Sequence, residues 1–271
     1  MKNFTNFRII DVHTHAWPDK VADKAREYLE DLFKVKLVSS PTVDTLLEFM
    51  DRNGIDVSCL CAVASRPEQV PSINDWLFSI RSERLRIFCA LHPEYEKWKE
   101  EIQRIREKGD GIKFQPEFQD FYVDDQNIFG IYEEIEKVGL PVLFHCGEEL
   151  SGTMKVRSSP SRIRRLHEKF PGLKIIAAHF GGFRMWDEVK KYLLGEDIYV
   201  DTAYFFRHLP EEDIKYFISH HPQERILFGT DFPLIDQKED IDYLTHLDIP
   251  LSSKEKIFSF NAAQLLGINF S

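Results

Sequence analysis

Histidine and aspartate residues stand at the ends of several short apolar runs, and their types and spacing suit metal chemistry. An Asp-x-His-x-His motif that contains His13 and His15 ends the first run, and His145, His179 and Asp231 end later ones. Residues two apart on a strand point to the same face, so the side chains of His13 and His15 are expected to converge on one point. Imidazoles combined with a carboxylate are ligands for zinc, and also for iron, manganese or cobalt.

A single strand-end histidine would be typical of core packing or of the surface. Several polar side chains at the C-terminal ends of strands instead favour one shared site. A catalytic metal keeps a coordination position open for water, whose pKa then falls from about 15.7 to about 7. The pattern therefore predicts an enzyme that uses a divalent metal, with zinc as the expected ion.

The elements that would position these residues are eight apolar, β-branched runs that alternate with amphipathic segments. The runs span residues 8–13, 56–63, 85–91, 111–114, 140–145, 173–179, 197–203 and 225–231. Strands that alternate with helices predict a parallel sheet, and nearly continuous apolar strands predict that both of its faces are covered. Eight such units in 271 residues favour a (β/α)8 TIM barrel of α/β class over an open doubly wound sheet. The active site of such a barrel lies at the C-terminal ends of its strands.

Turn and cap residues mark the ends of the helices. Gly54, Gly109 and Gly139 are expected just past helix C-termini, where a left-handed backbone favours glycine. Thr42 and Ser161 are expected to be N-caps.

An additional segment, residues 18–35, follows the first strand and precedes the helix expected to partner it, residues 42–53. An insertion at this point would lie over the mouth of the barrel, where it could act as a lid.

Composition limits the class of protein. No linker divides residues 1–271, so one domain is expected. A formal net charge of −10 argues against binding to nucleic acid or to an anionic membrane, and leaves a small molecule as the expected partner. The N-terminus lacks the apolar core of a signal peptide. The four cysteines lie mostly in apolar runs, so we expect buried free thiols and a cytoplasmic protein, with the oligomeric state, including a homo-oligomer, left open.

Several motifs in a fixed order resemble the amidohydrolase superfamily, and within it the amidohydrolase-related branch of metal-dependent TIM-barrel hydrolases and decarboxylases. The motifs are Asp11-x-His13-x-His15, Gly-Ile-Lys113, Pro141-Val-Leu-Phe-His145, Ala-His179-Phe-Gly-Gly, Gly229-Thr-Asp231-Phe-Pro and Asn261-Ala-Ala-Gln-Leu-Leu-Gly. The resemblance spans nearly the whole chain. It implies His13, His15, His145 and Asp231 as metal ligands. It also implies that His179 lies beside the metal as an acid–base group.

The expected reaction is hydrolysis of a small, carboxylate-bearing organic molecule by metal-activated water. Asp231 would take the proton from the water, and His179 would stabilise charge on the substrate. The alternative is non-oxidative decarboxylation of an aromatic or dienoic acid, with His179 as the proton donor. A further alternative is a metal-dependent sensor or scaffold without turnover.

Four residues are expected to bind the substrate. Lys113 could be carbamylated to bridge two metals, as in some members of the superfamily, but the resemblance favours one metal ion and an unmodified lysine that grips a substrate carboxylate. Arg184 could also meet an anion, and Trp17 and Tyr204 could line the mouth.

Overall fold

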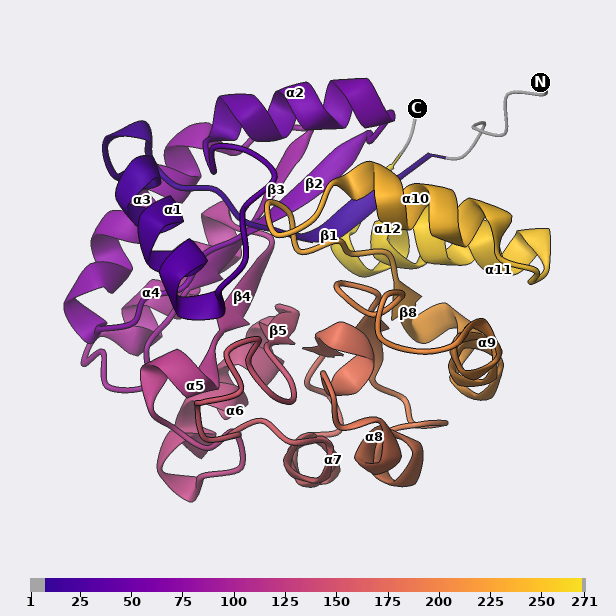
Figure 1. Ribbon diagram of the computed structural model, residues 1–271. Coiled ribbons are helices and arrows are strands. Elements are labelled where there is room, and N and C mark those ends of the chain that lie inside the picture. Colours follow the sequence, from indigo (N-terminus) through magenta and orange to yellow (C-terminus); the bar gives the residue numbers. More distant parts are fainter. Residues whose placement is uncertain (1–7, 270–271) are drawn as a thin grey trace.

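Eight parallel strands form the centre of this computed structural model, which describes residues 8–269 (Figure 1). The strands pair in sequence order from β1 to β8. Each strand coincides with one of the predicted apolar runs, and only β1 extends beyond its run, by one residue at Thr14, so the strand predictions are confirmed. Their bounds are β1 (Ile10–Thr14), β2 (Val57–Cys61), β3 (Leu85–Ala90), β4 (Gly111–Phe114), β5 (Val142–Phe144), β6 (Ile175–Ala177), β7 (Tyr199–Asp201) and β8 (Ile226–Leu227).

Backbone contacts between the last strand and the first close the barrel. The backbone N–H of Val12 donates to the carbonyl of Phe228 at 2.9 Å, and that of Asp231 donates to the carbonyl of His13 at 2.8 Å. A parallel bridge also joins Thr14 to Phe232. The predicted single-domain (β/α)8 barrel is therefore confirmed, and the open sheet is excluded.

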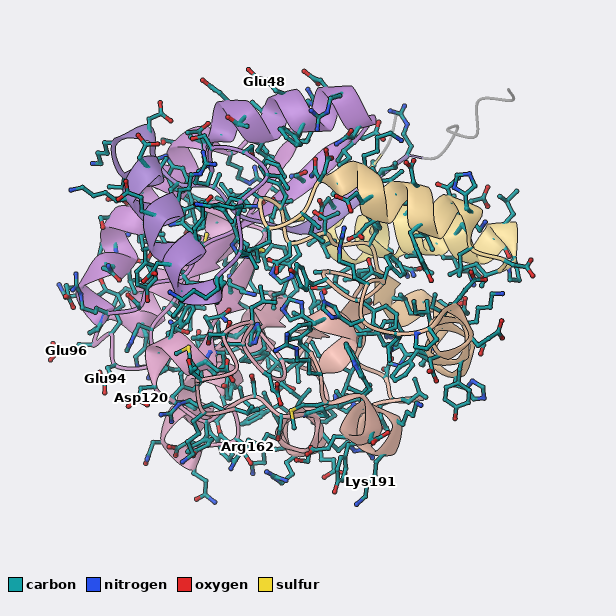
Figure 2. The ribbon with its side chains drawn as sticks, in the orientation of Figure 1. Glu48, Glu94, Glu96, Asp120, Arg162 and Lys191 are labelled. Atoms are coloured by element: carbon teal, nitrogen blue, oxygen red, sulfur yellow. The ribbon has the colours of Figure 1, made fainter. Side chains whose placement is uncertain are left out.

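Helices surround the barrel (Figure 1), and most of them bury one face. On α2, for example, the buried residues are Leu46 and Met50, one helical turn apart. Charged side chains such as Glu48 and Lys191 project outward from this layer (Figure 2). The helices are α1 (Asp19–Phe33), α2 (Val43–Asn53), α3 (Val70–Ile80), α4 (Trp98–Lys108), α5 (Pro116–Gln119), α6 (Phe129–Val138), α7 (Pro160–Lys169), α8 (Trp186–Tyr192), α9 (Glu211–His220), α10 (Gln237–His246), α11 (Leu251–Glu255) and α12 (Asn261–Leu266).

The predicted N-caps have different outcomes. Thr42 is confirmed, because its hydroxyl accepts the backbone N–H of Thr45 at 3.2 Å. Ser161 is wrong, because α7 begins at Pro160 and Ser159 precedes it. Proline suits the first helical position, since its φ is preset and the N–H that it lacks would have no partner there.

All three predicted helix-ending glycines follow the last residue of a helix, and two of them have the expected left-handed backbone. Gly54 and Gly139 have φ values of 71° and 77°, in the left-handed region. Gly109 is different, because its φ of −108° is open to any residue. Space explains the glycine instead, since a Cβ at this position would lie 2.8 Å from Sγ of Cys89.

The inserted segment forms α1, which follows β1 and contributes Val21, Ala25, Leu29 and Phe33 to the wall of a cavity. Its predicted position over the mouth is confirmed. The four cysteines are buried free thiols, as expected. Among the described residues, no helix is long and apolar enough to cross a membrane.

Substitution of Gly109 tests the steric explanation. We expect Gly109→Ala to lower the free energy of unfolding by about 1–3 kcal/mol, the usual cost of an added methyl in a packed interior. Cys89→Ala removes the nearest atom, so the double variant should recover part of that loss. Denaturant unfolding of the two single variants and the double variant measures this. A Gly109→Ala protein as stable as the wild type would contradict the explanation.

Candidate metal centre

The polar residues singled out in the sequence lie together at the C-terminal ends of the strands. His13 lies in β1, and His145 follows β5. His179 begins the turn η3 (His179–Gly181) after β6, and Asp231 follows β8. His179 and Asp231 have φ values of 57° and 69°, which are uncommon for residues other than glycine. Backbone strain of this kind gathers at functional sites, where surrounding contacts maintain it.

Three of the four predicted ligands form a close group. One side-chain ligand atom each from His13, His15 and Asp231 lies within 4.8 Å of the others. Oδ1 of Asp231 is 3.2 Å from Nε2 of His15 and 3.7 Å from Nε2 of His13. Two imidazole nitrogens and a carboxylate oxygen at this spacing are suited to hold one divalent ion.

The hydrogen bonds of His13 and His15 determine which ring nitrogen is free. Nδ1 of His13 donates to Oδ2 of Asp201 at 2.9 Å, and Nδ1 of His15 donates to the carbonyl of Cys61 at 2.8 Å. A neutral imidazole carries one proton, so Nε2 of each ring is left as an acceptor, and in His13 it faces Nζ of Lys113 at 3.2 Å. Outer partners of this kind fix the tautomer and orientation of metal-binding histidines.

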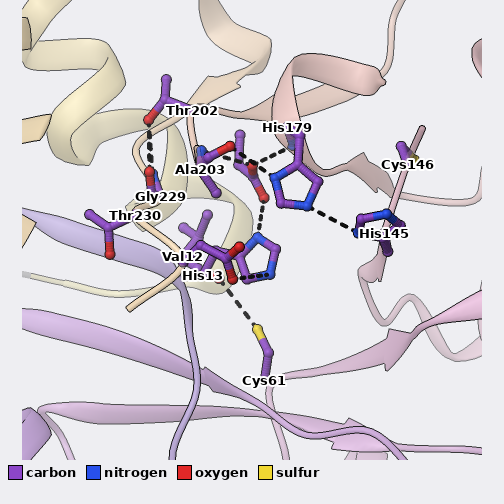
Figure 3. A network of polar contacts seen from close by, with 12 residues as sticks. Val12, His13, Cys61, His145, Cys146, His179, Thr202, Ala203, Gly229 and Thr230 are labelled. Carbon is purple, nitrogen blue, oxygen red and sulfur yellow. Dashed lines mark hydrogen bonds and ion pairs between the residues drawn. The ribbon is translucent and has the colours of Figure 1, made fainter. Parts of the chain in front are cut away.

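His145 and His179, which follow β5 and β6, also have one ring nitrogen fixed by a backbone carbonyl. Nδ1 of His179 donates to the carbonyl of Ala203 at 2.9 Å, and Nε2 of His145 donates to the carbonyl of Glu148 at 3.2 Å. The remaining nitrogens, Nε2 of His179 and Nδ1 of His145, face each other at 3.1 Å (Figure 3). This distance is that of a hydrogen bond with one shared proton, and a divalent metal could take the place of that proton.

His145 lies beside the group of His13, His15 and Asp231, and the ring of His179 contacts both His145 and His13. The ring centroids of His145 and His179 are 4.9 Å apart, and those of His179 and His13 are 5.4 Å apart. The close ligand group that contains His145 is instead formed with Glu117 and Glu149. Its role as the fourth ligand therefore stays a prediction.

Burial sets the protonation of these side chains. It lowers the pKa of both His13 and His145 well below the ordinary value, with the charge of Lys113 adding to the effect, so both rings are neutral. Burial alone would raise the pKa of Asp231, but the adjacent His13 and His15 outweigh it, and the net pKa lies below its usual range. Neutral imidazoles and an ionised carboxylate are the forms that bind metals.

Asp201, which ends β7, supports this group and was missed in the sequence. Besides His13, its carboxylate accepts the backbone N–H groups of His179 at 2.8 Å and Ala203 at 3.1 Å. Burial raises the pKa of Asp201 to about 6. The available signal was a polar residue at the end of an apolar run, as for His145 and Asp231.

Asp11 performs a similar role between the first and last strands. Its carboxylate accepts the hydroxyl of Thr230 at 2.6 Å and the side-chain amide of Gln237 at 2.9 Å. Burial raises the pKa of this carboxyl to about 7. Asp11 thus holds the turn that precedes Asp231 against β1.

A cavity of about 770 Å³ opens above these residues. Trp17 and Tyr204 line it, at the predicted position near the mouth. Its lining also includes Glu117 and Glu149, which the sequence analysis did not single out. Burial raises the pKa of both carboxyls, to about 8 for Glu149.

Lys113 and Arg184, both predicted to bind the substrate, lie outside the cavity lining. Lys113 is buried, and its Nζ donates to Nε2 of His13 at 3.2 Å. Arg184 is exposed, and its guanidinium lies 4.8 Å from the ring centroid of Phe183. In this arrangement Lys113 contacts the metal group from within the barrel, whereas Arg184 points to solvent.

Comparison with known proteins assigns the family. The chain belongs to the amidohydrolase family, whose model matches residues 10–268. A search of curated protein sequences finds no match. The recognition made from the sequence motifs is confirmed.

Similar solved structures include several decarboxylases. One is 5-carboxyvanillate decarboxylase from Sphingomonas paucimobilis, at 16% identity and a TM-score of 0.72, covering 97% of this chain and 100% of that one. Another is dihydroxybenzoic acid decarboxylase from Polaromonas with bound manganese and the inhibitor 2-nitroresorcinol, at 18% identity and a TM-score of 0.73, covering 98% of each chain. A third is 2,6-dihydroxybenzoate decarboxylase from Rhizobium, at 18% identity and a TM-score of 0.72, covering 97% of this chain and 99% of that one. At such low identity the likeness establishes the fold.

Removal of the two histidines of the first motif tests the metal centre. We expect purified wild-type protein to carry about one divalent ion per chain, held by the group of His13, His15 and Asp231. The double variant His13→Ala, His15→Ala should lose this ion, whereas His246→Ala, at an exposed position on α10, should keep it. Elemental analysis measures the content. Full retention in the double variant would exclude the assigned site.

Proposed function

We propose that this chain is a metal-dependent carboxy-lyase that removes CO2 from a small aromatic or unsaturated carboxylic acid. The observation that carries the proposal is the set of bare imidazole nitrogens and the Asp231 carboxylate at the foot of the cavity. Decarboxylases among the similar structures favour this reaction over the hydrolysis expected from the sequence.

A single divalent ion held by His13, His15, His145 and Asp231 would supply Lewis-acid chemistry, either polarising a substrate oxygen or lowering the pKa of water. Manganese is the first ion to test, because it is present in the dihydroxybenzoic acid decarboxylase structure. Zinc, the ion expected from the sequence, is the second.

His179 is the proposed proton donor. Its Nδ1 is fixed by the carbonyl of Ala203, so Nε2 is the ring atom that would first take up a proton and then pass it to the substrate. Protonation of the carbon that bears the carboxylate precedes cleavage of its bond to the carboxyl carbon. The electron pair of that bond returns to the ring or diene, and CO2 leaves.

The walls of the cavity suit an apolar, planar substrate. Trp17, Phe33, Trp76 and Phe118 are among the lining side chains, and α1 supplies much of one side. An apolar wall excludes water from the reacting carbon, which protects the protonated intermediate from other reactions until CO2 leaves. This is the environment that a ring or a conjugated chain would occupy.

Hydrolysis is the second candidate. It is supported by Asp231, an ionised carboxylate next to the imidazole of His15, which could accept a proton from water. The low pKa of Asp231 makes it a weak base, however, and general bases act best when their pKa lies near the working pH. This is a further reason to place decarboxylation first.

Product analysis decides between these reactions. Protein loaded with Mn2+ should release CO2 from at least one member of a panel of hydroxybenzoates, aminobenzoates and dienoic acids, in equal amount with the decarboxylated product. Lactones and amides should be left intact. Hydrolysis of those compounds without CO2 release would favour the hydrolase instead, and no turnover on either panel would favour a sensor or scaffold.

His179→Asn tests the proton donor. We expect the variant to keep most of its metal and to lose about 100-fold or more in kcat, the usual contribution of a general acid. The comparison pairs kinetics with elemental analysis of the same sample. Metal loss as complete as in His145→Ala would make His179 a ligand and not an acid.

Lys113→Met tests the role of the buried lysine. A single metal and an unmodified Lys113 predict unchanged metal content with a raised KM or lost activity, because an ammonium beside a dication is favourable only with an anion between them. Intact mass of the wild type should show no added CO2. Two metals per chain, one of them lost in Lys113→Met, would indicate a carbamate bridge.

A further inference from the structure

Helix α1 turns its apolar side toward the cavity instead of burying it against the barrel. Val21, Ala25, Leu29 and Phe33 recur every four residues, so they share one side of the helix, and all four line the cavity. Ala22 is the one buried residue of α1. Val21 is 37% exposed, although it is a large apolar side chain. Apolar surface left open in this way marks a place that a ligand covers.

Helix α3 supplies a second apolar wall of the same cavity, and both helices lie on the same side of the barrel (Figure 1). Toward the barrel, α3 buries Val70 and Leu77. Toward the cavity it turns Ile73 and Trp76, which are half-buried and lie about one helical turn apart. We call the space between these two residues and the apolar side of α1 the α1–α3 arm of the cavity.

The α1–α3 arm is continuous with the metal group. The carbonyl of Cys61 holds Nδ1 of His15 at 2.8 Å, and the next two residues, Ala62 and Val63, line the cavity on the way to α3. On the other side, the ring centroid of Trp17 is 6.1 Å from that of His15, and α1 begins shortly after Trp17. A molecule bound at the metal group therefore reaches the arm without leaving the cavity.

Charge and size indicate what the α1–α3 arm would hold. Lys20, exposed at the start of α1, is the only charged residue that either helix adds to the lining, and the polar side chains that they add, Tyr28 and Ser72, are also exposed. A polar group deep in the arm would lose water without gaining partners. Apolar cavities instead take up hydrocarbon. The whole cavity, about 770 Å³, has the size that encloses a drug-sized ligand, which is larger than one ring with a carboxylate.

We propose that the α1–α3 arm binds a hydrocarbon substituent of the substrate, either an alkyl chain or a second ring. The proposal rests on the proposed function, because the acid group is placed at the metal group of His13, His15 and Asp231. The substrate class is then a carboxylic acid whose ring or diene carries an apolar tail, larger than the dihydroxybenzoates that name two of the similar structures.

A homologous series tests this in protein loaded with Mn2+. The probes are benzoates that carry methyl to hexyl chains at each ring position, their phenyl-substituted counterparts, and ether chains as long as the hexyl chain, with affinity measured by calorimetry. For at least one ring position, affinity should rise about threefold to fourfold per added methylene, as expected for a buried CH2 group. Affinity that is independent of chain length at every position, or equal for hexyl and ether chains, would overturn the proposal.

Three variants locate the tail through the ratio of hexyl to methyl affinity, which cancels any uniform change in binding. Ala25→Phe fills the arm from α1, and Trp76→Ala removes its wall on α3, so both should lower the ratio while metal content stays unchanged. Glu27→Phe adds the same ring two residues away, on the opposite, exposed side of α1, and should keep the wild-type ratio. An unchanged ratio in both Ala25→Phe and Trp76→Ala would place the tail elsewhere and overturn the assignment.

The metal separates this proposal from the proposed function. No predicted ligand lies on α1 or α3, so the gain per methylene should persist in metal-free protein, whereas the affinity for unsubstituted benzoate should fall. Release of CO2 from an acid without any effect of chain length would overturn the arm alone. An effect of chain length without decarboxylation of any acid would overturn the proposed reaction and leave the arm as a binding site for apolar tails.

Discussion

The seam between β1 and β8 is the constraint on which the site depends. His13 and Asp231 come from opposite ends of the chain, and the backbone N–H of Asp231 donates to the carbonyl of His13 across this seam. Asp11 strengthens it by accepting both the backbone N–H and the hydroxyl of Thr230. Gly229 is required at the same level, because a Cβ there would lie 3.0 Å from Cβ of His13 and would separate the strands. Barrel closure and assembly of the ligand group are thus one event.

This arrangement buries several polar side chains at the end of the barrel. Asp11 and Asp201 are fully buried, and Lys113 is 1% exposed. An unpaired buried polar group costs about 1–3 kcal/mol, more when charged, so these side chains are retained only because each has partners. Asp201 illustrates this, since one carboxylate orients His13 and holds the backbone of His179. Removal of one member would therefore disturb several others.

Much of this fold could be predicted from the sequence because its signals are local. The apolar runs specify strands wherever both faces of the sheet are covered, and Asp-x-His-x-His places two imidazoles on one face by strand geometry alone. Gly109 and Ser161 could not be assigned in this way. Gly109 is required by its close contact with Cys89 on the neighbouring β3. Ser161 is not the cap because Pro160 occupies the first position of the helix, which places the cap at Ser159.

The residues of the candidate site also divide into those that local sequence signals predict and those that they do not. Ligands at strand ends could be anticipated, whereas Glu117 in the short helix α5 and Glu149 in the loop after β5 resemble polar surface residues in the sequence. Their burial depends on where the loop carrying Arg157 and Ser158 packs, which no local pattern specifies. The role of Arg184 stays a prediction, because its side chain is exposed and its guanidinium donates to the carbonyl of Leu150 at 3.5 Å.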